Sequence, residues 1–255
     1  MKIRIDRLLV ERGLAGSRER AQALILAGKV LVNEQKVEKP GAAVDAGAAV
    51  RLLGEDLRYV SRGGLKLEAA LEHWQVSVRG RACMDVGTST GGFTDCLLQR
   101  GAARVIAVDT GYGQIDARLR RDPRVRLLER TNARYLTAEQ VGEPVDFVAI
   151  DVSFISATLV LPSVVASCQW RVGSQAGRAR PDADHELVVL VKPQFEVGRE
   201  LVGKGGIVRD PDAQAAAVEK VRRLVVELGA TTDVIESPIL GAEGNREWLL
   251  YAKFP

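Results

Sequence analysis

The stretch ACMDVGTSTGG (residues 82–92) decides the fold of the larger part of this 255-residue chain. Residues 82–86 form a short apolar run typical of a buried strand, and a glycine-rich turn follows directly. Similar runs rich in Val and Ile occur at 104–108, 125–128, 145–150 and 187–191. Helical stretches lie between or after these runs, at 92–100, 114–121, 156–168 and 211–228. This alternation predicts an α/β fold, with a doubly wound, Rossmann-like parallel sheet covered by helices on both faces.

The ligand of such a sheet binds at the carboxyl ends of the strands, close to the switch in strand order. Asp109 follows the second strand, twenty-two residues past Gly87, where a carboxylate suits the hydroxyls of a ribose. The glycine turn has neither the G-x-G-x-x-G spacing of dinucleotide sites nor the lysine of phosphate-binding loops. A turn of low charge followed by an acid favours S-adenosylmethionine, which has no phosphates. The predicted cofactor-binding residues are Gly87, Thr88, Ser89, Gly91, Gly92, Phe93, Asp109, Asn132 and Asp151.

Composition excludes several other classes of protein. The chain is 46% hydrophobic and 27% charged, as in a globular protein with a large core. Its three cysteines form no C-x-x-C pair and it has two histidines, which argues against a disulfide scaffold and against a metal centre. The first residues contain no apolar run of a secretory signal, so the expected location is the cytoplasm.

One segment has nearly the length of a membrane span. Residues 152–170 contain no charged side chain, and about 20 residues suffice to cross a bilayer. The segment also contains Pro162 and several serines. We therefore expect a helix packed on the sheet, and no contact with a membrane.

The positive charge of the chain is concentrated near its start. Residues 1–58 contain eleven Lys and Arg against eight Asp and Glu, whereas the remaining residues carry no net charge. This asymmetry indicates a small basic module attached to a neutral one. We place the basic module at 1–56, a short linker at 57–62 and the larger domain at 63–255.

The basic module has the pattern of two short helices followed by small strands. Apolar spacing predicts helices at 4–12 and after the N-cap residue Ser17, with Gly28 as a left-handed stop. Strands are predicted at 30–33, 36–37 and 49–53. The stretch SRERAQALILAGKVLVNEQKVEKPGAAV (residues 17–44) resembles the α+β RNA-binding module of ribosomal small-subunit protein four and of pseudouridine synthases. The resemblance implies RNA binding, for which the candidate residues are Arg4, Arg7, Arg18, Arg20, Lys29 and Lys36.

Four charged residues stand at strand ends or beside them, and their motifs carry a second resemblance. They are Lys66, Asp151, Lys192 and Glu247. The segments SRGGLKL (61–67), DVGTSTGGF (85–93), IDVSF (150–154), LVKPQFE (190–196) and GNREWLL (244–250) are similar to the motifs of FtsJ-type ribose 2′-O-methyltransferases. With the basic module included, the chain resembles the TlyA family of ribosomal RNA 2′-O-methyltransferases, once named hemolysins. The resemblance implies a class I methyltransferase sheet, S-adenosylmethionine as cofactor, a Lys-Asp-Lys-Glu catalytic tetrad, and a cytidine of ribosomal RNA or of a ribosomal subunit as target.

These residue types suit the chemistry that the resemblance implies. A ribose hydroxyl is a poor acid and must lose its proton as it attacks the methyl group. We expect Lys192 to accept that proton, with Lys66 as the neighbouring cation, because burial and a nearby positive charge disfavour an ammonium. Asp151 and Glu247 then orient the two lysines, and no metal ion is needed. The segment after the fourth strand, at 151–154, lacks the two prolines typical of base methyltransferases.

Some features leave alternatives open. An arginine-rich stretch at 118–134 fits a salt-bridged solvent face or a rim that docks RNA. Lys204 lies in a glycine-rich loop that we expect to close over the substrate nucleotide, and residues 171–185 have the composition of a surface insertion. We expect a monomer or weak dimer. Two other functions remain as alternatives, namely a ribosome-assembly factor without catalysis and a membrane-active hemolysin.

Overall fold

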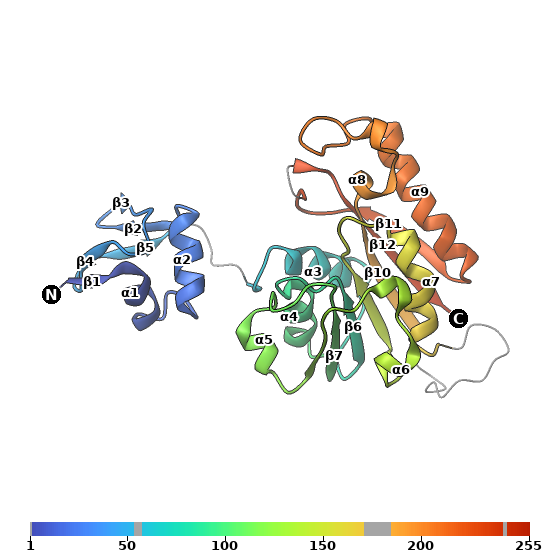
Figure 1. Ribbon diagram of the computed structural model, residues 1–255, viewed down its shortest axis with the longest axis horizontal. Helices are drawn as coiled ribbons and strands as arrows, with labels where there is room; N and C mark the ends of the chain where they lie inside the picture. Colours follow the sequence, from blue (N-terminus) through green and yellow to red (C-terminus); the bar gives the residue numbers. More distant parts are fainter. Residues whose placement is uncertain (1, 54–57, 171–184, 242–243) are drawn as a thin grey trace. The chain divides into compact units, whose positions relative to one another are not determined.

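The computed structural model of the protein describes residues 2–53, 58–170, 185–241 and 244–255. It divides into two compact units, Met1–Leu57 and Arg58–Pro255, which are drawn in Figure 1. The predicted insertion at 171–185 lies outside the described residues, except for His185, which begins a strand. Part of the predicted linker lies outside them as well. Tyr59, further along that linker, is buried in the core of the second unit.

The first unit packs two helices on short antiparallel strands. The helices are α1 (Ile5–Glu11) and α2 (Arg18–Leu26). The strands are β1 (Lys2–Arg4), β2 (Val30–Val32), β3 (Gln35–Lys36), β4 (Ala43–Asp45) and β5 (Val50–Leu52). Strand β2 lies between β3 and β5, and β1 pairs with β4. Ser17 caps α2 as predicted, because its hydroxyl accepts from the backbone N–H of Arg20 at 3.2 Å.

The second unit is built on a seven-stranded sheet in the order β11-β12-β10-β9-β6-β7-β8. The strands are β6 (Ala82–Val86), β7 (Arg104–Val108), β8 (Val125–Leu128), β9 (Phe147–Ile150), β10 (His185–Val191), β11 (Thr231–Glu236) and β12 (Trp248–Phe254). Strands β6 to β10 run parallel, whereas β12 is antiparallel to both of its neighbours. The chain passes from β6 outward to β8 and then returns to the other side of β6 with β9. This arrangement confirms the doubly wound sheet, with its switch point between β6 and β9.

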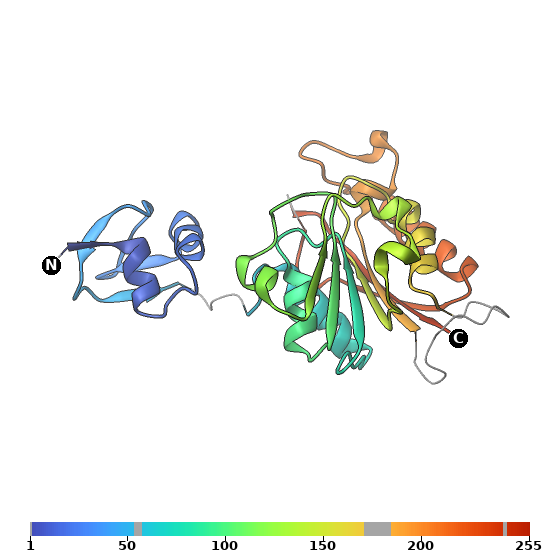
Figure 2. The same ribbon diagram turned by 60° about the horizontal axis from the view of Figure 1, so that its bottom comes forward.

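Helices cover both faces of this sheet, as Figures 1 and 2 show. Those of the second unit are α3 (Gly63–His73), α4 (Gly92–Gln99), α5 (Ala117–Arg121), α6 (Ala138–Val141), α7 (Ala157–Ser167), α8 (Pro193–Glu196) and α9 (Pro211–Glu227). Helices α3 and α4 enclose one core against the sheet, and α7 and α9 enclose the other. The carboxyl ends of β6 to β10 therefore meet at one edge between two rigid layers.

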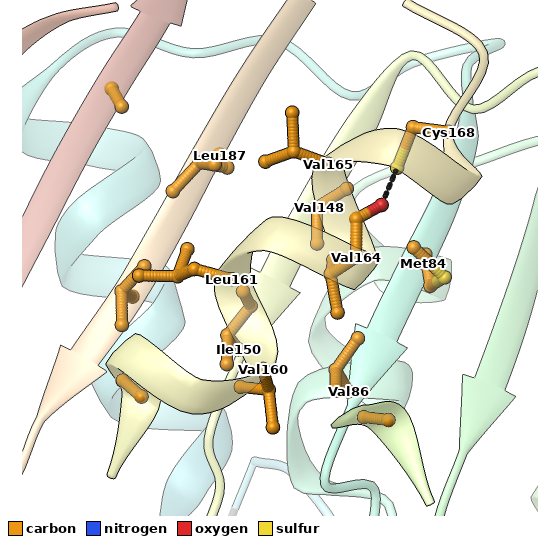
Figure 3. Close-up of a cluster of buried hydrophobic side chains, with 14 of the residues drawn as sticks. Met84, Val86, Val148, Ile150, Val160, Leu161, Val164, Val165, Cys168 and Leu187 are labelled. Atoms are coloured by element: carbon orange, nitrogen blue, oxygen red, sulfur yellow. Dashed lines mark hydrogen bonds between the residues drawn. The ribbon is translucent and has the colours of Figure 1, made fainter. Parts of the chain in front are cut away.

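Helix α7 occupies most of the uncharged segment and is part of the core. Figure 3 shows Val160, Leu161 and Val164 facing Val148 and Ile150 of β9. Helix α7 has 11 residues, and the prediction that this segment packs on the sheet is confirmed. Within the described ranges, the structure contains no helix that is long and apolar enough to cross a membrane.

Candidate active site

Two pockets adjoin at the carboxyl edge of the sheet. The first has a volume of about 490 Å³ and is lined by the segments that follow β6, β7, β8 and β9. The second has a volume of about 370 Å³ and is lined by the start of α3, the turn after β6, Lys192 and residues 239–241. Both linings include Gly87, Ser89, Asp151 and Ser153. The turn after β6 and the turn after β9 thus form the boundary between the two pockets.

At this boundary, the glycine turn after β6 allows the turn after β9 to approach closely. Gly87 has φ +89°, and a Cβ atom there would lie 2.4 Å from the carbonyl oxygen of Asp151. Only glycine accepts both the left-handed backbone and the close approach of the neighbouring turn. Gly91, with φ +98°, precedes α4, and a Cβ atom there would collide with the side chain of Leu119. The two glycines therefore allow the turn to pack tightly against its neighbours, while Ser89 of the same turn lines both pockets.

Asp109 lies in the first pocket and joins two of its lining segments by hydrogen bonds. Its carboxylate accepts the backbone N–H of Ser89 at 2.7 Å and that of Gly111 at 2.6 Å. Asn132 lines the same pocket, and its side-chain oxygen accepts from the backbone N–H of Arg134. An ionised carboxylate has about four acceptor positions, so Asp109 can accept further hydrogen bonds. Of the other predicted cofactor residues, Thr88, Gly92 and Phe93 line the second pocket.

Two lysine–carboxylate pairs lie at the second pocket, which Lys66, Asp151 and Lys192 line directly. Lys192 Nζ lies 2.6 Å from Asp151 Oδ1 and donates to Ser153 Oγ at 2.8 Å. Lys66 Nζ donates to Glu247 Oε2, and both of these side chains are buried. Lys66 and Lys192 both line this pocket, although 126 residues separate them in the chain. The structure thus gathers the four predicted residues, and it adds Ser153, which lies in the motif at 150–154 but was not predicted to contact Lys192.

Asp85 is a further charged group that the sequence did not single out. It is completely buried at the end of β6, and its Oδ2 accepts the backbone N–H and the hydroxyl of Thr94. Burial, with the negative charges of Asp151 and Asp109, raises the pKa of Asp85 to about 7. The hydrogen bonds from Thr94 act in the opposite direction and lower it. This carboxyl group therefore retains its proton up to nearly neutral pH.

The predicted RNA-binding residues of the first unit surround a buried acid. Asp6 is inaccessible to solvent and accepts from the guanidinium groups of Arg4 (2.8 Å) and Arg18 (2.9 Å). These hydrogen bonds, with one from Gln22, hold the pKa of Asp6 well below its usual range despite its burial. Arg4, Arg7, Arg18 and Lys36 are exposed, whereas Arg20 and Lys29 are half-buried. Ion pairing therefore fixes Arg4 and Arg18 while their outer faces remain accessible.

Five arginines of the arginine-rich stretch in the second unit form two groups. Three arginines form ion pairs on the surface, namely Arg118 with Asp116, Arg120 with Glu129, and Arg124 with Asp122. Two others lie over exposed tyrosine rings, Arg130 at 4.4 Å from Tyr112 and Arg134 at 5.7 Å from Tyr135. The interpretation as a salt-bridged face fits the first group alone.

Lys204 lies in an exposed hairpin closed by a bridge between Gly203 and Ile207. Asn245, two residues before Glu247, anchors this hairpin by donating to the carbonyl of Gly206 at 2.9 Å. Among the residues that the structure describes, no three His, Cys, Asp or Glu side chains gather in a way that could hold a metal ion.

Comparison with known proteins gives matches over both units. Residues 59–254 match the family model of FtsJ-like methyltransferases, and residues 3–50 match that of the S4 domain. The 16S/23S rRNA (cytidine-2′-O)-methyltransferase TlyA of Mycobacterium tuberculosis is 48% identical over 254 residues, which cover 99% of this chain and 90% of that protein. Hemolysin A of Brachyspira hyodysenteriae is 36% identical, over 98% of this chain and 99% of that protein. A solved structure of a hemolysin-named protein from Streptococcus thermophilus is 42% identical and has a TM-score of 0.72, over 99% of this chain and 88% of that one.

Proposed function

The chain belongs to the FtsJ-like methyltransferase family and carries an S4 domain, and on this basis we propose that it transfers a methyl group from S-adenosylmethionine to a cytidine 2′-hydroxyl of ribosomal RNA. One observation supports the ribose hydroxyl as the target. Both lysines and Asp151 line the second pocket together with the glycine turn, and Glu247 pairs with Lys66. The specificity for cytidine rests on the relative from Mycobacterium tuberculosis, whose name states it.

The first pocket fits the cofactor. Gly87 lets the turn after β6 pack directly against the backbone of Asp151, and both turns line this pocket. Asp109 is placed to accept hydrogen bonds from the ribose hydroxyls of the cofactor, with Asn132 on the same wall. The bound cofactor would supply a methyl group already activated by a positively charged sulfur. This positive charge disfavours the protonated form of a lysine nearby.

Lys192 is the group that accepts the proton of the hydroxyl. Its Nζ lies at the boundary of the two pockets, where Asp151 and Ser153 hold it from one side. Proton removal and alignment are the two tasks left to the protein, because the methyl donor needs no further activation. Lys66, fixed by Glu247, donates to the hydroxyl oxygen and neutralises charge that develops there.

The first unit binds the RNA. Its exposed cations, among them Arg4, Arg18 and Lys36, contact phosphates without reading the sequence, which is the usual source of affinity for RNA. The second unit then selects the nucleotide that enters the second pocket.

The test uses ribosomal RNA from a strain that lacks the gene, incubated with purified protein and cofactor labelled on its methyl group. We expect label to enter the RNA, and the Lys192→Ala variant to incorporate it about 10²–10⁴-fold more slowly. RNA that binds tightly but remains unlabelled would favour the alternative of an assembly factor without catalysis. Calorimetry with S-adenosylhomocysteine separates the two cases further, since a vestigial site would lack affinity for it.

A further inference from the structure

A buried carboxylate lies four residues after Lys192, at the end of α8. The side chain of Glu196 is 2% exposed. Its Oε1 accepts the backbone N–H of Ala157 at 2.6 Å, and its Oε2 accepts the hydroxyl of Ser156. Lys220 of α9 supplies a positive charge at 3.3 Å from Oε2. The carboxylate is thus fully engaged, and it faces α7 and α9 rather than either pocket.

The contacts of Glu196 join the two segments that carry the proposed proton acceptor and its partner. Lys192 is the N-cap residue directly before α8, and Glu196 ends this one-turn helix. Ser156 and Ala157 begin α7, five residues after Asp151. The segments after β9 and β10 are therefore connected twice, at the pocket by Lys192 and Asp151 and behind it by Glu196 and α7.

Joining two turns through a buried charge costs free energy. An ionised carboxylate loses its hydration when it is buried, and this loss is repaid only by close hydrogen bonds and opposite charge. Glu196 gains additionally from its place at the N-terminus of α7, where free N–H groups favour a negative charge. These hydrogen bonds form only when the carboxylate, at the end of the Glu196 side chain, reaches the start of α7. The length of this side chain therefore sets the spacing between α8 and α7.

We infer that Glu196 is a positioning residue for methyl transfer, which sets Lys192 against Asp151 and Ser153 by anchoring α8 to the start of α7. The inference rests on the proposed function, because it assigns no contact with substrate to Glu196. In this role, the rate of methyl transfer depends more on the length of the side chain at position 196 than on its charge.

Two conservative variants test this distinction. Glu196→Gln keeps the length, and its amide oxygen can still accept from Ala157 while its amide nitrogen donates to Ser156. Glu196→Asp keeps the charge but is one methylene too short to reach both partners without moving α8. We expect kcat of Glu196→Asp to fall by roughly 10–100-fold, the scale of a displacement of about 1 Å at a reacting group. We expect Glu196→Gln to stay within about threefold of the original enzyme by the same argument.

The measurements are kcat and KM for RNA in single-site methylation, the Kd for S-adenosylmethionine by calorimetry, and the melting temperature. In Glu196→Asp, the Kd for the cofactor and the KM for RNA are expected to remain unchanged. The matched control is Glu186→Asp, since Glu186 is a buried carboxylate at the opposite end of β10, paired with Arg81. Glu186→Asp shortens a buried glutamate in the same way, so it controls for a general loss of stability. Its kcat is expected to remain unchanged.

Three outcomes would overturn the inference. These are a normal kcat in Glu196→Asp, an equal loss of kcat in Glu186→Asp, and a loss in Glu196→Gln as large as that in Glu196→Asp. Failure of the proposed function is recognised separately, because the unmodified protein would then transfer no methyl group in the same assay.

Discussion

Lys192 is the residue on which the proposed chemistry depends most. Its replacement by alanine removes the proton acceptor but leaves the first pocket intact, since Lys192 lines only the second. We expect the rate of methyl transfer to fall by about 10²–10⁴-fold, the usual contribution of a general base. Cofactor affinity, measured by calorimetry, is expected to change little. Transfer within a few-fold of the original rate would exclude Lys192 as the base, and the control is Lys253→Ala, an exposed lysine of β12.

Asp109 is expected to carry much of the affinity for the cofactor. Removal of its carboxylate in Asp109→Ala leaves the ribose hydroxyls of the ligand without a partner, and it frees the N–H groups of Ser89 and Gly111. The expected loss of binding free energy is roughly 1–3 kcal/mol. Calorimetry of the variant measures it directly, and an unchanged Kd would contradict the assignment of the first pocket.

Asp85 predicts a pH dependence of stability. Its pKa is about 7 in the folded protein, against 3.8 for an ordinary Asp, so between these values the unfolded chain is ionised while the native state keeps the proton. The free energy of unfolding contributed by Asp85 is therefore greatest below pH 3.8 and is lost as the pH rises to about 7. Asp85→Asn cannot ionise, so its stability relative to the original protein should improve from pH 4 to pH 8, on the basis of this linkage. Denaturant unfolding at several pH values measures this difference, and parallel curves would contradict it.

At the scale of single elements, the glycine turn after β6 is the most constrained. Gly87→Ala combines a positive φ with a Cβ atom placed 2.4 Å from the carbonyl oxygen of Asp151. We expect the free energy of unfolding to fall by on the order of 1–3 kcal/mol. Cofactor affinity should fall as well, because the turns after β6 and β9 would be pushed apart. Gly80→Ala also has a positive φ but no neighbour within 4 Å of the added atom, so it is the control for backbone strain.

The sequence predicted the elements whose patterns are local. The apolar runs of β6 to β9 and the cap at Ser17 depend on neighbouring residues, and they were found close to their observed bounds. Strands β1, β4 and β11 were missed because they are short or half-exposed and therefore lack a continuous apolar run. The helix expected from residue 114 begins instead after Asp116, whose side chain caps it.

The site could be predicted from its motifs, but its contacts could not. Asp151, Lys192 and Glu247 follow or flank recognisable strands, which is enough to place them at the carboxyl edge, whereas Lys66 lies in α3. The pairing of Lys66 with Glu247 spans 181 residues and arises only from the fold. Ser153, Asp85 and Glu196 were missed for the same reason, since their roles depend on tertiary contacts.

At the scale of the whole molecule, the two units are expected to divide the work. A fragment that begins at Arg58 keeps both pockets and the buried Tyr59, so it should fold and bind the cofactor with normal affinity. It lacks Arg4, Arg18 and Lys36 and should bind RNA more weakly, with a smaller dependence on salt, because fewer counterions are released. A salt titration of both proteins on one ribosomal RNA fragment measures this, and equal affinities with equal slopes would show that the S4 domain is not the RNA anchor.

The position of the transferred methyl group tests the central claim most directly. Ribosomal RNA from a strain lacking the gene is methylated by the purified protein, digested to nucleosides and analysed by mass spectrometry. We expect 2′-O-methylcytidine as the new nucleoside, formed by the unmodified protein and formed about 10²–10⁴-fold more slowly by Lys192→Ala. A methyl group on the base, or the appearance of 2′-O-methylcytidine with Lys192→Ala at an undiminished rate, would contradict it.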